Sequence, residues 1–330
     1  MRPGTGMSLT LGRPVPARRR PDRFLADRWA VTGGLVALGF GLIAVLAPVI
    51  SKIEGQDPYT YHLQALDDAG SPIGFGGGIS AAHWFGVEPL TGRDLFAIVV
   101  YGARTSLTVG LVSATLAMFI GVLVGITAGF FGGWYDRLVS RFIDILYGFP
   151  ELVFMIALGA IASARFPKEL LVILVIGAFG WPTTARVIRG QTMALKHRTF
   201  VVASTAMGSS PGHVLLRQVL PNLGSTIVVY TTIRIPSMIG YEAALSFLGV
   251  GVPAPTPSWG RSIGEGVTWV ETDPMFLFFP GAALFLVTLA FNLLGDGLRD
   301  ALDPRSIGRH APGPPAPGLV AAVPVEVESK

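Results

Sequence analysis

The sequence predicts an all-α integral membrane protein with six transmembrane helices. Of its 330 residues, 51% are hydrophobic and only 14% are charged, whereas soluble domains carry about 25% charged residues. The apolar runs are close to the ~20 residues that cross a bilayer as a helix. Basic residues gather on alternate sides of these runs, as expected if cytoplasmic loops are enriched in Lys and Arg.

Composition argues against several functions. The chain has no cysteine, so it can form neither disulfides nor thiolate metal sites. We expect no metal site, because the histidines lack ligand spacing: His62, His83, His197, His213 and His310. The net charge of +4 is explained by membrane topology, so we expect no nucleic-acid partner. No phosphate-binding loop of the G-x-x-x-x-G-K-[ST] type occurs, so the chain cannot hydrolyse ATP alone.

The two ends are predicted to be disordered cytoplasmic tails, residues 1–28 and 306–330. The first is arginine-rich and lacks an apolar pattern, and the second is rich in Pro, Ala and Gly. Residues 29–50 then form the first transmembrane helix. A cleaved signal peptide is the alternative, but its apolar core would be only ~7 to 15 residues long.

Residues 51–98 are predicted to be an extracytoplasmic loop, because they carry mostly acids, opposite to the arginines before the first helix. Near the end of this loop, Thr91 and Asp94 are suited to cap the next helix. A binding role for this segment is the alternative.

Residues 99–305 are predicted to hold the five remaining helices. The long apolar run 95–131 has small residues at three- and four-residue steps, which let membrane helices pack closely: Gly110, Ser113, Ala114, Ala117, Gly121 and Gly125. The third span, 142–164, is interrupted at 148–151 by Gly-Phe-Pro-Glu, where the proline should kink the helix. We expect Asp144 and Glu151 beside this kink to face the interior of the bundle.

The later spans are predicted at 170–185, 223–248 and 275–294. The fifth carries Arg234 and Glu242, and a charge at membrane depth costs roughly 2.5 to 3.5 kcal/mol unless it is paired or wet. These two residues should therefore face either each other or a polar pathway. The outer segment 250–274 has too many prolines for a helix.

The basic, mostly polar stretch 181–222 separates two apolar runs and should face water on one side of the membrane. Thr199 is predicted to cap a short helix that ends at Gly208, a suitable left-handed residue, and Ser210 with Pro211 starts a second helix. The product would be a helical corner exposed to water, which suggests a docking surface.

This corner resembles the "EAA" loop of the permease subunits of bacterial ABC importers. The matching residues are the small pair Ala203-Ser204, then Gly208, then Leu220-Pro221, whereas the family's leading glutamate is Val202 here. Other segments resemble the peptide-transporting branch, and the similarity covers roughly residues 25–305. These segments are D-x-L-x-x-F-P at 144–150, E-A-A-L-S-F-L-G at 242–249, P-T-P-S-W-G at 255–260 and N-L-L-G-D at 292–296.

The resemblance implies the C-type transmembrane subunit of a di- or oligopeptide importer, with a cytoplasmic coupling helix in the segment 186–221. The residues that would contact the ATPase are Val202, Ala203, Ser204, Met207, Gly208, Leu220 and Pro221. The residues that would line the translocation path are Asp144, Glu151, Arg234 and Glu242. For Arg234 and Glu242, an internal or inter-subunit salt bridge that locks packing and a contact with peptide termini are both open.

The implied partners are a paralogous permease subunit, two cytoplasmic ATPases and an extracytoplasmic peptide-binding protein, in the inner membrane with both termini cytoplasmic. This chain would need no cofactor, because ATP and Mg²⁺ would bind the ATPases. Three alternatives stay open: a nickel-importing permease of the same branch, an ion-coupled secondary transporter, and a purely structural membrane subunit. The second would need internally repeated broken helices, and no such repeat is detected.

Overall fold

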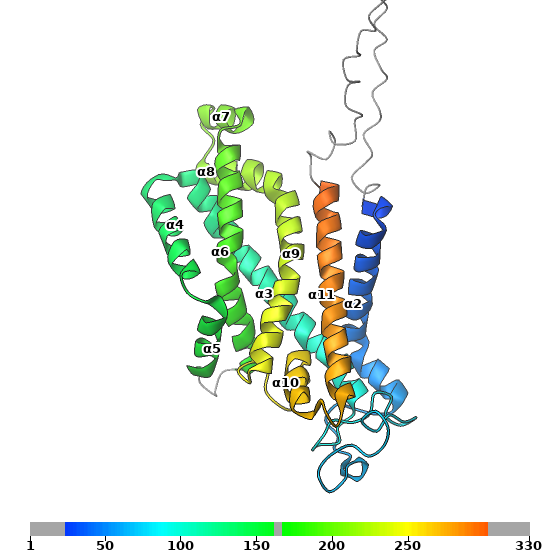
Figure 1. Cartoon of the computed structure of the whole chain (residues 1–330). Coiled ribbons are helices and arrows are strands. Elements are labelled where there is room, and N and C mark those ends of the chain that lie inside the picture. The colour runs from blue at the N-terminus through cyan, green and yellow to red at the C-terminus, as the bar shows by residue number, and fades with distance from the viewer. Residues whose placement is uncertain (1–23, 162–166, 303–330) are drawn as a thin grey trace, which may run out of the picture.

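The computed structural model describes residues 24–161 and 167–302, and within them it is helical, with only two isolated β-bridges. The predicted tails fall outside the described residues, apart from 24–28. Five long helices of the described chain form the bundle (Figure 1). They are α2 (Arg28–Glu54), α3 (Leu95–Phe131), α6 (Lys168–Lys196), α9 (Leu220–Phe247) and α11 (Pro274–Leu302). Helix α3 crosses the bundle obliquely relative to the other four. Shorter elements are α4 (Gly133–Tyr147), α5 (Glu151–Ile161), α7 (Thr199–Ala206), α8 (Pro211–Val214), α10 (Trp259–Trp269), a 3-10 turn at Leu63–Ala65 and a π-helical turn at Leu215–Val219.

Four of these helices, α2, α3, α6 and α11, are long and apolar enough to cross a membrane. The pair α4 and α5 is bent by 84° and would give a fifth crossing if it counts as one broken span. The all-helical fold agrees with the sequence prediction, while the number of six spans stays a prediction. The bend falls at the Gly148-Phe149-Pro150 break, as the proline predicts.

Small residues of α3 allow α6 to approach closely, as their spacing predicts. A Cβ placed on Gly125 would lie 2.6 Å from the Ala185 carbonyl oxygen, and one on Gly129 would lie 2.7 Å from the Arg189 carbonyl oxygen. Larger residues at either position would push α6 away. The α3–α6 contact is therefore specified by glycines rather than by large interlocking side chains.

The structure differs from the prediction at α6 and at α10. Helix α6 continues through the basic residues past Ala185 to Lys196, so the irregular corner is shorter than the segment 186–221. The segment 250–274 was expected to be too proline-rich for a helix, but α10 begins at Trp259, two residues after Pro257. Proline is compatible with the residues that precede a helix, and that is where these prolines stand.

Helix α7 lies at one end of the bundle, and α10 and the loop 55–94 lie at the other (Figure 1). We call these the α7 end and the loop end. The start of α2 and the end of α11 are both at the α7 end, as an even number of crossings requires.

Candidate functional site

The corner at the α7 end is built on Gly208, which has a φ of +86°. The Ser209 amide donates to the Ser204 carbonyl (3.1 Å) and the Gly208 amide to the Thr205 carbonyl (3.0 Å). These two bonds define a Schellman motif, which requires a left-handed residue at its turn. The left-handed role predicted for Gly208 is confirmed.

The start of α7 differs from the prediction. Thr199 is the first helical residue, and Arg198 occupies the N-cap position without a side-chain hydrogen bond. The second helix starts as predicted, because Ser210 caps the His213 amide at 3.4 Å and Pro211 is the first helical residue. The corner is thus ordered at its glycine and at Ser210 rather than at Thr199.

Side chains on the inner face tie the corner to the bundle. The Ser204 hydroxyl donates to Ser209 (2.8 Å) and accepts from the Gln218 amide (2.5 Å). The Lys196 ammonium donates to the Phe130 carbonyl at the end of α3 (2.6 Å). Beneath them lies an apolar cluster of Ile126, Ile188, Val201, Val214, Val219 and Leu223. Because α3, α6 and α9 all contribute to this cluster, α7 packs against three long helices at once.

The outer face of the corner is apolar and cationic. The side chains of Phe200, Val202 and Met207 are 44%, 53% and 80% exposed. Of the remaining predicted docking residues, Ala203, Gly208 and Pro221 are exposed, Leu220 is half-buried and Ser204 is buried. The sequence contains no Asp or Glu between Glu169 and Glu242. This face can therefore bind an apolar cleft with an acidic rim, without offering a carboxylate of its own.

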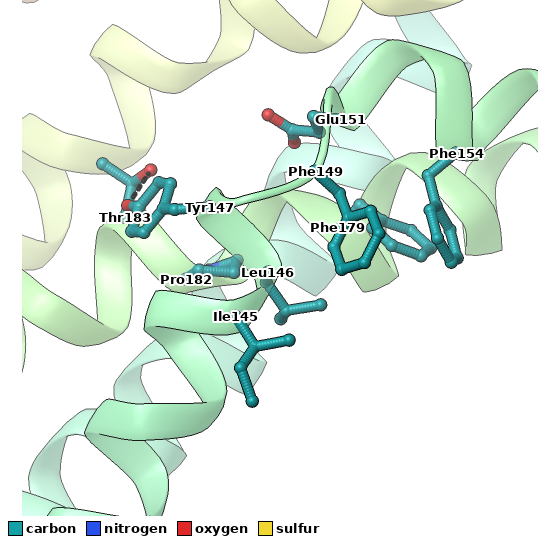
Figure 2. A pocket seen from close by; sticks show the side chains of 9 residues that line it. All are labelled: Ile145, Leu146, Tyr147, Phe149, Glu151, Phe154, Phe179, Pro182 and Thr183. Atoms are coloured by element: carbon teal, nitrogen blue, oxygen red, sulfur yellow. Dashed lines mark hydrogen bonds between the residues drawn. The ribbon is translucent and has the colours of Figure 1, made fainter.

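The break between α4 and α5 places Glu151 at the first residue of α5, beside a cavity of about 220 Å³. Figure 2 shows the carboxylate turned away from the rings of Phe149, Phe154 and Phe179 that line this cavity. One oxygen, Oε2, accepts a hydrogen bond from the Tyr241 hydroxyl of α9 at 2.8 Å. The other, Oε1, is buried and has no partner among the described residues.

The two charged residues of α9 do not face each other. Arg234 donates from Nη2 to the Gly180 carbonyl of α6 at 2.9 Å, and its Nε has no partner in the described part of the chain. Glu242 is fully buried and accepts from the hydroxyls of Ser246 (2.9 Å) and Ser258 (2.8 Å). Since Ser258 directly precedes α10, Glu242 joins α10 to α9. The expectation that Arg234 and Glu242 could face each other is wrong, whereas an ion pair of either residue with another subunit stays a prediction.

Asp144 was predicted to face the bundle interior, but its side chain is 54% exposed and pairs with Arg186 at 2.7 Å. Arg186 also stacks over the Tyr147 ring, with its guanidinium carbon 4.5 Å from the ring centroid. Nearer the start of α4, Arg189 binds Asp136 through both carboxylate oxygens. These ion pairs fasten α4 to α6 on the α7 side of the break.

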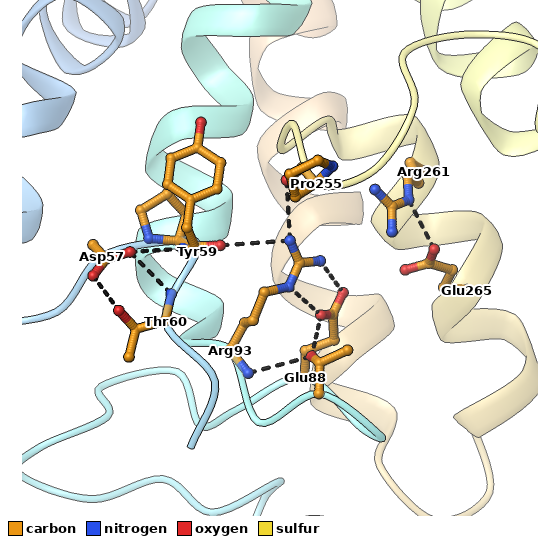
Figure 3. Close-up of polar contacts among 10 residues, drawn as sticks. Asp57, Tyr59, Thr60, Glu88, Arg93, Pro255, Arg261 and Glu265 are labelled. Carbon is orange, nitrogen blue, oxygen red and sulfur yellow. Dashed lines mark hydrogen bonds and ion pairs between the residues drawn. The ribbon is translucent and has the colours of Figure 1, made fainter. Parts of the chain in front are cut away.

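At the loop end, a buried ion pair joins Glu88 to Arg93 (Figure 3). The guanidinium binds the carboxylate at two points, 2.7 and 2.8 Å, and donates to the Pro255 carbonyl at 3.0 Å. Both side chains are about 5% exposed or less. This ion pair was not predicted from the sequence, although an acid at 88 and an arginine at 93 are close enough along the chain to indicate one.

Asp94 caps α3 as predicted, accepting from the Ala97 amide at 2.7 Å, while Thr91 bonds to Glu88 instead of to the helix. The His83 Nδ1 lies 2.9 Å from the Asp94 carboxylate. Burial raises the pKa of Asp94 to about 6 and lowers the pKa of His83. The contact between His83 and Asp94 ties the loop to the first turn of α3. Among the described residues, no three His, Asp or Glu side chains gather as metal ligands.

Taken together, the geometry defines an all-helical membrane subunit with a water-exposed helical corner at one end and a broken helix with polar side chains in its middle. Residues 121–308 match the family model of binding-protein-dependent transport system inner membrane components. The chain belongs to this family, and is therefore the permease component of an ABC importer.

Named relatives cover nearly the whole chain. The glutathione transport system permease protein GsiD of Pectobacterium atrosepticum is 38% identical over 88% of this chain and 92% of its own. The dipeptide transport system permease protein DppC of Alkalihalophilus pseudofirmus is 35% identical over 88% and 90%. A chain of the MetNI methionine ABC transporter, in an inward-facing conformation, has the same fold, with a TM-score of 0.50 and 23% identity over 64% of this chain and 97% of its own.

Proposed function

We propose that this chain is the transmembrane subunit of an ATP-driven importer for di- or oligopeptides. The observation that carries this proposal is the near full-length similarity to permeases of glutathione and dipeptide systems. Glutathione is a tripeptide, so the relatives share short peptides as the chemical class of cargo. The chain would form half of the translocation path, with a paralogous permease forming the other half.

In this proposal, the corner around α7 is the coupling helix. Its exposed apolar side chains would sit in a cleft of a cytoplasmic ATPase, and its buried face is joined to the cluster that α3, α6 and α9 share. ATP and Mg²⁺ would bind the two ATPase subunits. Closure of these subunits would push on α7 and rock the long helices between outward-open and inward-open arrangements.

The α7 end would then be cytoplasmic, with six crossings and both termini on that side. The loop end, with α10 and the acidic loop 55–94, would receive an extracytoplasmic peptide-binding protein. Of the four residues predicted to line the path, Glu151 and Arg234 keep that role because each has a polar atom without a described partner and a side chain that is only half-buried. The Glu242 Oε2 also lacks a described partner, but this residue is fully buried. Asp144 would lie at the cytoplasmic mouth, and Glu242 would position α10 instead of contacting cargo.

The proposal is tested by uptake in a strain that lacks the gene. Labelled dipeptides, glutathione and ⁶³Ni²⁺ would be supplied separately, with and without the gene restored on a plasmid. We expect the restored gene to recover uptake of a peptide, and unlabelled peptide but not nickel to compete. Recovery of nickel uptake alone would contradict the assigned cargo. A purified complex that contains no ATPase would contradict the assigned mechanism.

A further inference from the structure

The polar groups at the α4–α5 break have bonding capacity that the described chain does not use. Glu151 has one carboxylate oxygen without a partner, and Arg234 has its Nε without one. Neither forms an ion pair with another described residue; Glu151 is bonded to a hydroxyl, and Arg234 to a backbone carbonyl. An unpaired charge at membrane depth is costly and marks a functional position.

Arg234 belongs to α9, and Glu151 of α5 is bonded to Tyr241 of the same helix α9. Tyr241, which holds Glu151, is seven residues from Arg234, and this spacing brings both onto one face about 10 Å apart along the helix axis. Arg234 in turn reaches α6 at Gly180, between the cavity-lining residues Phe179 and Pro182. The acid and the arginine therefore border the same region from opposite ends.

Room for a ligand exists between them. On α9, Ser237 and Gly240 are small and exposed, and a Cβ placed on Gly240 would meet nothing within 4 Å. The broken backbone at 148–150 is the kind of irregular segment that is tolerated at membrane depth where it lines a cavity. The cavity of about 220 Å³ lies directly beside it.

We propose that Glu151 and Arg234 form a transient binding site for the two charged ends of a short peptide during its passage. Glu151 binds the α-ammonium group, and Arg234 binds the α-carboxylate. An extended chain spans at most 3.3 to 3.6 Å per residue, so the termini of a di- or tripeptide are about 7 to 10 Å apart. This range includes the axial separation of about 10 Å between Arg234 and Tyr241, the residue to which Glu151 is bonded. The inference rests on the proposed function, because it assumes that peptides pass this face.

The test uses the complete transporter, with its ATPases and binding protein, reconstituted in liposomes. Uptake rates are measured for dialanine, its C-terminal amide and its N-acetyl derivative, at saturating binding protein. The binding protein has its own preference among these substrates, but that preference is the same for every permease variant. It therefore cancels when the ratio of two substrates is compared between wild type and variant.

We expect wild type to favour dialanine over its amide, and Arg234→Gln to reduce that preference about tenfold, as the loss of a charge-assisted hydrogen bond would. Arg234→Lys should restore part of it. Glu151→Gln should act in the same way on the ratio of dialanine to its N-acetyl derivative, and leave the amide ratio unchanged. Asp136→Asn, a control on α4 at a residue with no assigned place in the path, should change neither ratio.

Equal loss of uptake for all three substrates would overturn the inference and leave peptide transport intact. The same holds if both glutamine variants fail to assemble with the ATPases, because the two residues would then serve subunit packing. If the wild-type complex imports no peptide at all, the proposed function itself fails, and this inference fails with it.

Discussion

The Schellman turn at Gly208 offers a substitution whose effect is confined to the backbone. Gly208 has a φ of +86°, and a Cβ at this position would meet no atom within 4 Å. Gly208→Ala therefore introduces no steric clash with the rest of the chain. It changes only the cost of the left-handed conformation, which is about 1 to 2 kcal/mol for an L-residue.

That cost is large for a local turn. It shifts the equilibrium between the formed and the opened corner by roughly 5- to 30-fold. When the corner opens, the Ser209–Ser204 bond that ends α7 is lost, and α7 is no longer held against the apolar cluster below it. A movement of the ATPase would then displace the long helices in a smaller fraction of the ATP hydrolysis cycles.

The assay measures peptide uptake and ATP hydrolysis in the same reconstituted complex. We expect Gly208→Ala to lower the ratio of uptake to hydrolysis by about fivefold or more, the lower end of that shift. Gly212→Ala is the matched control, because Gly212 lies in the same corner, also has open space around its Cβ position and is not left-handed. A normal ratio for Gly208→Ala, or an equal loss for both variants, would refute this reasoning.

Three further changes test the fold. Gly125→Ala should destabilise the protein by about 1 to 3 kcal/mol, because its Cβ would overlap α6. Gly190→Ala, whose Cβ would have open space, should be neutral or stabilising by up to ~1 kcal/mol. The two variants are compared by thermal unfolding in detergent. Glu88→Gln should lower the free energy of unfolding by about 3 to 5 kcal/mol, because it leaves Arg93 buried without its counter-charge. An unchanged unfolding temperature would contradict a stabilising role for this ion pair. Since burial raises the pKa of Asp94, this carboxyl contributes most stability below its unfolded-state pKa and loses that contribution as the pH rises through about 6. Asp94→Asn keeps a good N-cap and should flatten this part of the pH profile of unfolding, whereas an unchanged profile would show that other groups cause it.

Features that depend on local chemistry could be predicted from the sequence. The left-handed glycine at 208, the Ser210-Pro211 helix start and the kink at Pro150 each follow from a residue's own conformational limits. The close contact of α3 with α6 followed from the spacing of small residues, because that spacing fixes which face is smooth.

Features that depend on which distant segments meet could not be predicted. Glu242 and Arg234 looked equivalent as charges in one apolar run, yet Ser258, sixteen residues beyond Glu242, donates a hydrogen bond to Glu242 alone. Likewise, the Tyr241 hydroxyl reaches Glu151 across ninety residues, and nothing in either local sequence indicates it. The extension of α6 to Lys196 was missed because its polar residues resemble a loop, although a helix that leaves the membrane can continue in water.

The central claim is that the α7 corner contacts a separate ATPase on the cytoplasmic side. Met207 is 80% exposed at the tip of this corner, and the natural chain has no cysteine, so Met207→Cys provides a single attachment point. A maleimide photo-crosslinker attached there in the assembled complex should form an adduct with the ATPase subunit. Labelling of Cys at this position by a membrane-impermeant maleimide added outside intact cells, or an active complex that yields no ATPase adduct, would contradict the claim.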